Sequence, residues 1–154
     1  MVAGVQREMV SMSDHAELLF DVYSHSDNAM LRATLAPVMA DPDAFATHFY
    51  ANLFARAPAL RSLFPSDMNL QRMKLVQTLG VVAAGLDQPE VLIGTLEELG
   101  ARHRGYGVKF AHYVEVGEAL IAALAEVNGP AFTGSARSAW HRLYAWVAEQ
   151  MRRG

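Results

Sequence analysis

The chain of 154 residues contains no cysteine. This absence excludes disulfides, thiolate metal ligands and a cysteine nucleophile. The sequence also lacks an apolar run long enough to span a bilayer, and its first residues lack the apolar core of a secretion signal. We therefore expect a soluble, cytoplasmic protein with no membrane partner.

The motifs of most enzyme classes are missing as well. There is no glycine-rich phosphate loop, no Gly-x-Ser-x-Gly elbow, no His-Glu-x-x-His zinc motif and no evident pair of catalytic carboxylates. Lysine and arginine are dispersed along a chain of net charge -3, so we expect no nucleic-acid partner. Hydrophobic residues make up 52% of the chain, and a large apolar cofactor would be one way to use this excess.

The apolar pattern predicts an all-α fold, because nearly every segment has helical periodicity and no β-hairpin signal occurs. Asp41 with Pro42, Asp87 with Pro89, and Thr133 are expected to cap helices. A polar stretch at 24–28 is expected to end a short leading helix. The main helices are expected over 29–40, 42–57, 68–86, 109–127 and 133–151, together with the helix that carries His103 and stops at Gly105 and Gly107, and a short turn at 58–64.

His103 is the most informative single residue. It shares one helical face with Leu92, Leu96 and Leu99, just before the helix ends. A histidine at such a place either satisfies itself in the core by bonding to a carbonyl or holds a metal cofactor. No second histidine or carboxylate stands nearby at the spacing of a zinc site. A b-type haem needs only one protein ligand and an apolar slot, so both interpretations stay open.

Tyr50 follows Phe49 in the predicted helix over 42–57, and most buried tyrosines only find a carbonyl for their hydroxyl. Gln71 stands on the apolar face of its predicted helix, beside Leu75. Burying an amide without a partner costs about 1–3 kcal/mol, so Gln71 either reaches water near its helix start or serves a purpose in a cavity. Together the two residues are candidates for neutral hydrogen-bond donors to a ligand that becomes partly negative. Phe64, at a helix-to-loop corner, is either a core residue or a wedge against a flat cofactor.

Several runs, taken together, resemble the globin family, and most closely its single-domain bacterial haemoglobins and the haem domain of flavohaemoglobins. The resemblance covers about Ala29 to Met151. It rests on Phe49-Tyr50-Ala51-Asn52-Leu53-Phe54, Pro58, Leu63-Phe64-Pro65, Gln71-Arg72-Met73-Lys74-Leu75, Leu99-Gly100-Ala101-Arg102-His103-Arg104-Gly105-Tyr106-Gly107-Val108, His112-Tyr113, Val116-Gly117-Glu118-Ala119-Leu120, Ala139-Trp140 and Leu143-Tyr144.

This resemblance implies a globin fold, in which helices pack three over three around haem b. Residues 28–154 would form the globin domain and 1–27 an N-terminal extension. The resemblance makes His103 the proximal iron ligand and Tyr50 and Gln71 the distal pair. The other implied pocket residues are Leu75 over the iron, Phe64 on the porphyrin, Tyr113 behind the proximal histidine, and Leu99 and Val108.

The implied function is reversible, high-affinity binding of dioxygen, with nitric oxide and carbon monoxide as further ligands. The alternative is nitric oxide dioxygenation, which needs a separate reductase because one turnover leaves ferric iron. The lack of a flavin or nicotinamide domain in these residues favours binding, whereas the Tyr50 and Gln71 pair favours dioxygenation. A gas sensor and a globin that binds no haem are further alternatives, and the oligomeric state is left open.

Overall fold

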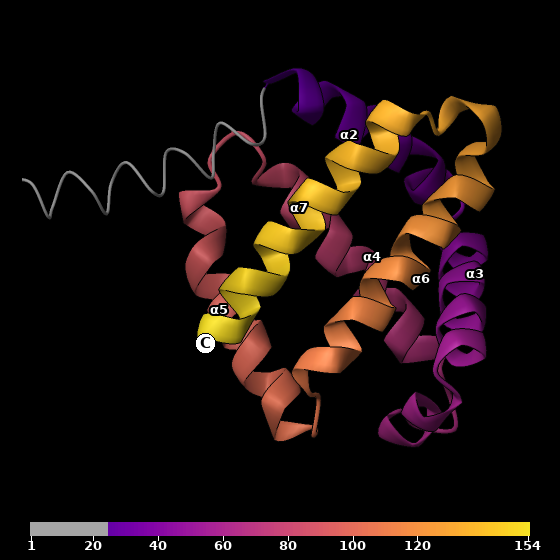
Figure 1. Ribbon diagram of the computed structural model, residues 1–154, viewed down its shortest axis with the longest axis vertical. Coiled ribbons are helices and arrows are strands. Elements are labelled where there is room, and N and C mark those ends of the chain that lie inside the picture. Colours follow the sequence, from indigo (N-terminus) through magenta and orange to yellow (C-terminus); the bar gives the residue numbers. More distant parts are fainter. Residues whose placement is uncertain (1–24) are drawn as a thin grey trace, which may run out of the picture.

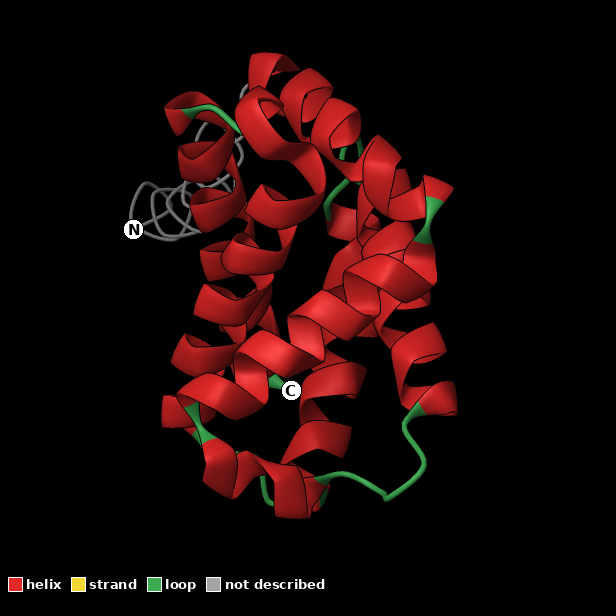
Figure 2. Ribbon diagram, turned by 90° about the vertical axis from the view of Figure 1, so that its right-hand side faces the viewer, coloured by secondary structure: helices red, strands yellow, loops and turns green. Residues whose placement is uncertain are grey.

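The computed structural model describes residues 25–154, and this part of the chain is helical with no strand (Figure 1). Figure 2 shows the helices joined by short loops. The elements are α2 (His25–Ala40), α3 (Pro42–Arg56), η1 (Pro58–Leu63), α4 (Asn69–Ala84), α5 (Glu90–Gly105), α6 (Phe110–Asn128), η2 (Gly129–Ala131) and α7 (Gly134–Arg153), where η marks a 3-10 helix. The predicted all-α fold is confirmed.

Local sequence signals account for several helix ends. The Asp41 carboxylate accepts a hydrogen bond from the Ala44 N–H at 3.2 Å, and the Thr133 hydroxyl accepts one from the Ala136 N–H at 3.2 Å. Both are the predicted N-caps of α3 and α7. Gly107 has a φ of 85°, a conformation that favours glycine, and it turns the chain between α5 and α6.

Two local predictions are wrong. Residues 25–28 do not break a helix but open α2, because tertiary contacts outweigh their polarity: the buried Asn28 amide donates to the Leu86 carbonyl at 3.3 Å. Asp87 does not cap α5, whose N-cap position is Pro89. Its carboxylate instead forms an ion pair with Arg32 at 2.9 Å. The predicted leading helix over 16–23 lies outside the described residues.

The helices pack as pairs around one apolar core. In the described chain, α3 lies along α6 and α5 along α7, while α2 covers parts of α6 and α7. The end of α7 lies beside α5 (Figure 1). The most deeply buried large side chains are Leu31, Val38, Phe45, Leu53, Leu96, Ile121 and Leu124. This packing supports α5 and α6 from the α7 side, and α5 carries His103.

Helix α4 is attached differently from the others. It packs on α3 and α2, and no extended contact joins it to α5 within the described residues. Its predicted inner face is only partly covered: Val82 is buried, whereas Met68, Gln71, Leu75 and Leu79 are half-buried. The apolar inner side of α4 is therefore not sealed by protein.

No helix in the described part of the chain combines the length and apolarity needed to cross a membrane.

Candidate functional site

His103 lies in the last turn of α5, and its ring is held by the helix itself. The Nδ1 atom is 2.7 Å from the carbonyl oxygen of Leu99, one turn earlier. Because a carbonyl can only accept, Nδ1 carries the proton, and in the neutral ring Nε2 carries the lone pair. That tautomer is the one in which an imidazole binds a metal through Nε2 while a backbone acceptor orients the ring. The half-buried His103 thus fits the role of a single axial ligand.

Tyr50 places a hydroxyl in apolar surroundings. Its side chain is 7% exposed, and its ring packs edge-on against Phe49, with ring centroids 4.9 Å apart. The hydroxyl donates to the backbone carbonyl of Gln71 at 3.5 Å. This distance is long for an O–H···O hydrogen bond. The bond is therefore weak, and the hydroxyl can donate to another acceptor instead.

The electrostatics keep Tyr50 protonated. Burial raises the pKa of its hydroxyl above the ordinary value, and the Gln71 side chain and the Arg72 guanidinium offset only part of that rise. Tyr50 is therefore a neutral donor at physiological pH. Gln71 lies in the first turn of α4 and is half-buried, with Leu75 one turn further along the helix. The structure thus brings together Tyr50 and Gln71, the two predicted distal donors.

Phe64 closes the aromatic cluster around Tyr50. Its ring meets Tyr50 edge-on, with centroids 5.6 Å apart and planes at 74°, and meets Phe54 at 5.4 Å and 72°. Tyr50 and Phe54 are stacked with centroids 5.9 Å apart. Phe64 is half-buried and contacts Tyr50, while its predicted contact with a cofactor stays a prediction.

Arg61 is a residue that the sequence analysis missed. Its guanidinium donates to the carbonyls of Phe64, Pro65 and Ser66, at 3.3, 2.9 and 3.2 Å, and lies 5.4 Å from the centroid of the Phe54 ring. These contacts fix the loop that positions Phe64. Side-chain bonds to loop carbonyls follow no periodicity, so spacing offers no signal for them.

Tyr113 of α6 and Tyr144 of α7 contact each other. The Tyr144 hydroxyl donates to the Tyr113 carbonyl. Its ring lies against Gly117, where a Cβ would stand 2.5 Å from a ring carbon. Burial raises the pKa of both tyrosines, and Arg104 and Arg152 offset part of the rise at Tyr113. No hydrogen bond among the described residues joins the Tyr113 hydroxyl to His103, so its role behind the histidine stays a prediction.

The predicted residues fall on two groups of elements. In the first group, Tyr50 lies on α3, Phe64 directly follows η1, and Gln71 and Leu75 lie on α4. The second group belongs to α5, α6 and the turn between them, and consists of Leu99, His103, Val108 and Tyr113. Leu75, Leu99, Val108 and Tyr113 are all half-buried. Helices α4 and α5 make no extended contact in the described chain. The residue types of the two groups, mostly apolar with His103 as the single nitrogen ligand, fit a flat apolar cofactor.

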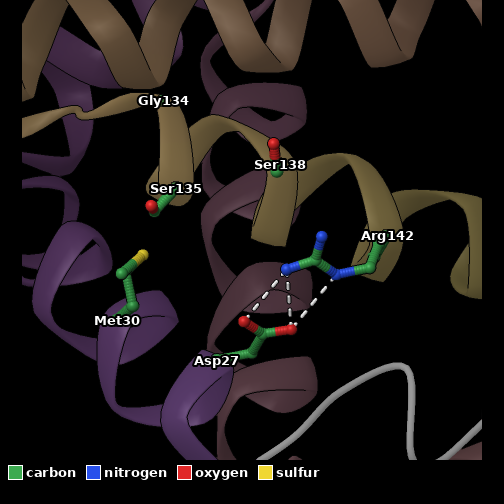
Figure 3. A pocket seen from close by; sticks show the side chains of 6 residues that line it. All are labelled: Asp27, Met30, Gly134, Ser135, Ser138 and Arg142. Carbon is green, nitrogen blue, oxygen red and sulfur yellow. Dashed lines mark hydrogen bonds and ion pairs between the residues drawn. The ribbon is translucent and has the colours of Figure 1, made fainter.

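A cavity of about 390 Å³ lies elsewhere, at the start of α7 (Figure 3). None of the predicted site residues lines it. Arg142 and Asp27 face each other across it in a two-oxygen ion pair, with N–O distances of 2.9–3.1 Å. No group of three metal-ligating side chains occurs within the described residues.

The sequence model of the globin family matches residues 47–151 of the chain. The chain belongs to the globin family. The flavohemoprotein of Bordetella pertussis is 33% identical over 125 residues, which cover 79% of this chain and 31% of that protein. The flavohemoprotein of Rhizobium meliloti is also 33% identical, over 78% of this chain and 30% of that protein. This globin thus spans about a third of the length of these curated relatives.

Solved structures agree on the fold. An engineered carbene transferase from Rhodothermus marinus, described as a candidate nitric oxide dioxygenase, superimposes with a TM-score of 0.72 at 30% identity, covering 82% of this chain and 88% of that chain. A bacterial globin from Campylobacter jejuni also gives 0.72, at 19% identity and with coverage of 82% and 91%; that likeness shows the fold alone. The predicted globin fold is confirmed, and the globin and flavohemoprotein relatives imply that the chain binds haem.

Proposed function

We propose that this globin binds haem b and reversibly binds dioxygen with high affinity. Haem b would supply an iron that His103 could hold and that could bind a diatomic gas such as dioxygen, nitric oxide or carbon monoxide. His103 supplies Nε2, oriented by the bond from Nδ1 to Leu99. Phe64 and Leu75 exclude water on the distal side, and Leu99, Val108 and Tyr113 do so on the proximal side.

The buried hydroxyl of Tyr50 carries the oxygen-binding proposal. It is a neutral donor with one long bond to a backbone carbonyl, at 3.5 Å, and it lies next to Gln71, whose amide is a second donor. Two neutral donors favour a ligand that gains negative charge when it binds. Each net hydrogen bond contributes about 0.5–1.5 kcal/mol, so the pair slows the release of oxygen.

Stopped-flow measurement of oxygen release tests this function. Reduced, oxygenated protein is mixed with an excess of carbon monoxide, and the loss of the oxygenated spectrum gives the dissociation rate. We expect slow release of oxygen followed by formation of the carbon monoxide complex. Immediate and irreversible oxidation of the protein by oxygen would contradict reversible binding.

Nitric oxide dioxygenation is the second candidate function, and the Rhodothermus marinus relative favours it by its description. Conversion of nitric oxide and oxygen to nitrate oxidises the iron, so sustained turnover needs a separate reductase as partner. Continuous nitric oxide consumption with nitrate formation, measured with an added flavin reductase and NADH, would support this activity. A single turnover that stops despite rapid reduction of the iron would reject it.

A further inference from the structure

The corner where α5 gives way to α6 exposes large apolar side chains. Tyr106, Phe110 and Val114 are 67%, 58% and 55% exposed. Phe110 and Val114 are one turn apart on α6 and so share a face, and Tyr106 lies in the turn that precedes this helix. Single exposed apolar residues are common, but several together on one face mark a surface that contacts another molecule.

Folding also gathers positive charge at this corner, although lysine and arginine are dispersed in the sequence. The Arg152 guanidinium, from the end of α7, lies 4.0 Å from the centroid of the Phe110 ring. Arg104 donates to the carbonyl of Gly154. Arg152 stands two residues before Gly154, so this bond brings the end of α5 to the end of α7.

Positive charge is concentrated within two stretches at the corner, which Glu98, Glu115 and Glu149 border in the sequence. The stretches 99–114 and 150–154 hold no aspartate or glutamate, yet they contain five of the 13 lysine and arginine residues of a chain whose net charge is -3. Glu149 offsets part of this charge through ion pairs with Arg153 at 3.4 Å and Arg152 at 3.9 Å. The five cations are Arg102, Arg104, Lys109, Arg152 and Arg153.

This corner borders both sides of the candidate site. On one side Arg104 follows His103 directly in the sequence. On the other, a Leu63 methyl group lies 4.0 Å from the place a Cβ on Gly107 would take, and Leu63 precedes Phe64. A protein bound at this corner would thus lie next to the residues proposed to hold haem.

We propose that Tyr106, Phe110 and Val114, with Arg104, Lys109 and Arg152, form a docking surface for an acidic electron-donor protein that carries a reduced flavin. The proposal rests on the proposed function, because both oxygen binding and nitric oxide dioxygenation use ferrous iron. In each encounter one electron leaves the flavin, which is oxidised by one electron, and reduces ferric iron to ferrous iron. No atom passes between the two proteins.

Charge favours this occupant over two others. A second copy of the chain docked through the same corner would place like charges opposite each other. An anionic membrane would meet only three large apolar side chains on a protein whose net charge is itself negative, which is little apolar area for insertion. The carboxylates of an acidic protein would pair with the arginine and lysine side chains, and its apolar surface would cover Tyr106, Phe110 and Val114. An apolar centre with a polar rim is expected of a protein–protein contact.

The test measures reduction of the ferric holoprotein by photoreduced flavodoxin, an acidic flavin protein, at several salt concentrations. The variants Lys109→Glu and Arg152→Glu reverse one charge each. Arg137→Glu is the matched control. Arg137 is exposed and lies near the start of α7, and its substitution makes the same change in net charge. We expect the second-order rate at low salt to fall about tenfold in the two corner variants and less than twofold in the control, with the difference vanishing at high salt. Equal effects in all three variants would overturn the proposal.

A second readout does not depend on iron. Flavodoxin is added to isotope-labelled protein, and the amide resonances that shift locate the surface it contacts. Shifts concentrated at residues 104–114 and 150–154, and reduced in Phe110→Ser, support the proposal. Shifts confined to other elements, or binding of phosphatidylserine vesicles without binding of flavodoxin, overturn it. A chain that takes up no haem yet shows the expected shifts would refute the proposed function and still locate the docking surface.

Discussion

Two side chains carry the proposed chemistry: the hydroxyl of Tyr50 as a hydrogen-bond donor to the bound gas, and Nε2 of His103 as the ligand to iron. His103 was predicted from its place on an apolar helical face, and Tyr50 from its pairing with Gln71 and from the family resemblance. Their hydrogen bonds were not predictable in detail. His103 satisfies one nitrogen on its own helix, as the alternative of a core histidine expects, but this same bond leaves the other nitrogen suited to a metal.

Removing the Tyr50 hydroxyl tests its role as a donor. In Tyr50→Phe the aromatic contacts with Phe54 and Phe64 remain, and only the hydrogen bond is lost. A net bond of about 0.5–1.5 kcal/mol corresponds to a roughly two- to tenfold change in rate, so oxygen should dissociate faster by that factor. Stopped-flow mixing with carbon monoxide gives the rate. Tyr106→Phe, at an exposed position, is the control, and an unchanged rate in Tyr50→Phe would remove Tyr50 from the distal role.

Other residues at this scale were beyond sequence reasoning. Arg61 positions Phe64 through carbonyl contacts that depend on the path of a loop. The implied link between Tyr113 and His103 has no hydrogen bond in the described structure, whereas the Tyr113 carbonyl is held by Tyr144. Such contacts join elements far apart in sequence, so neither periodicity nor capping patterns reveal them.

At the scale of helices, the apolar periodicity of the sequence predicted which segments are helical and in what order they come. The residue types Asp41 and Thr133 predicted two N-caps. The failures have a tertiary cause. Asp87 has the chemistry of a cap, but it pairs with Arg32 of α2, and the polar residues around Asn28 are helical because that amide finds the Leu86 carbonyl. The division into residues 1–27 and 28–154 stays a prediction.

Two of the glycines in helix α5 have opposite surroundings. A Cβ on Gly100 would collide with the backbone of Met151 in α7, whereas a Cβ on Gly94 would meet nothing within 4 Å. We expect Gly100→Ala to destabilise the protein by about 1–3 kcal/mol through overpacking. We expect Gly94→Ala to stabilise it by about 0.5–1 kcal/mol, since alanine favours the helix and restricts the unfolded chain.

Urea denaturation of both variants measures these changes in the free energy of unfolding. The pair controls for the helix, because each variant adds one methyl group to α5. Equal stabilisation in the two variants would show that α5 and α7 do not approach each other closely at Gly100, and would remove the support that this contact gives to the helix carrying His103.

At the scale of the whole molecule, buried tyrosines set the behaviour in alkali. Burial raises the pKa of Tyr50, Tyr113 and Tyr144 above the ordinary value of 10.0. The native state therefore retains these protons at a pH at which the unfolded chain loses them. The stability that they contribute is fully present below about pH 10 and is lost as the pH rises further.

The free energy of unfolding should therefore fall above about pH 10, which urea denaturation between pH 8 and 12 measures. Tyr144→Phe should show a shallower fall, although it starts from a lower stability because it loses its bond to the Tyr113 carbonyl. The exposed variant Tyr106→Phe is the control, and a fall in Tyr144→Phe as steep as in the wild type would contradict the assignment.

The charge pattern of the whole molecule was also beyond sequence reasoning, because cations dispersed along the chain meet at one corner only after folding. The fold itself was accessible, since the apolar pattern and the resemblance agree with the match to globins over residues 47–151. The sequence pattern does not decide between reversible oxygen binding and nitric oxide dioxygenation, because sustained dioxygenation depends on a reductase partner.

The visible absorption spectrum of the reduced protein, recorded with haem added, tests the central claim most directly. For the wild type we predict a Soret band that shifts when oxygen is admitted. For His103→Gly we predict a changed band whose wild-type position returns when free imidazole is supplied as a ligand. A wild type with no Soret band, or a His103→Gly variant with the wild-type spectrum in the absence of imidazole, would contradict a haem held by His103.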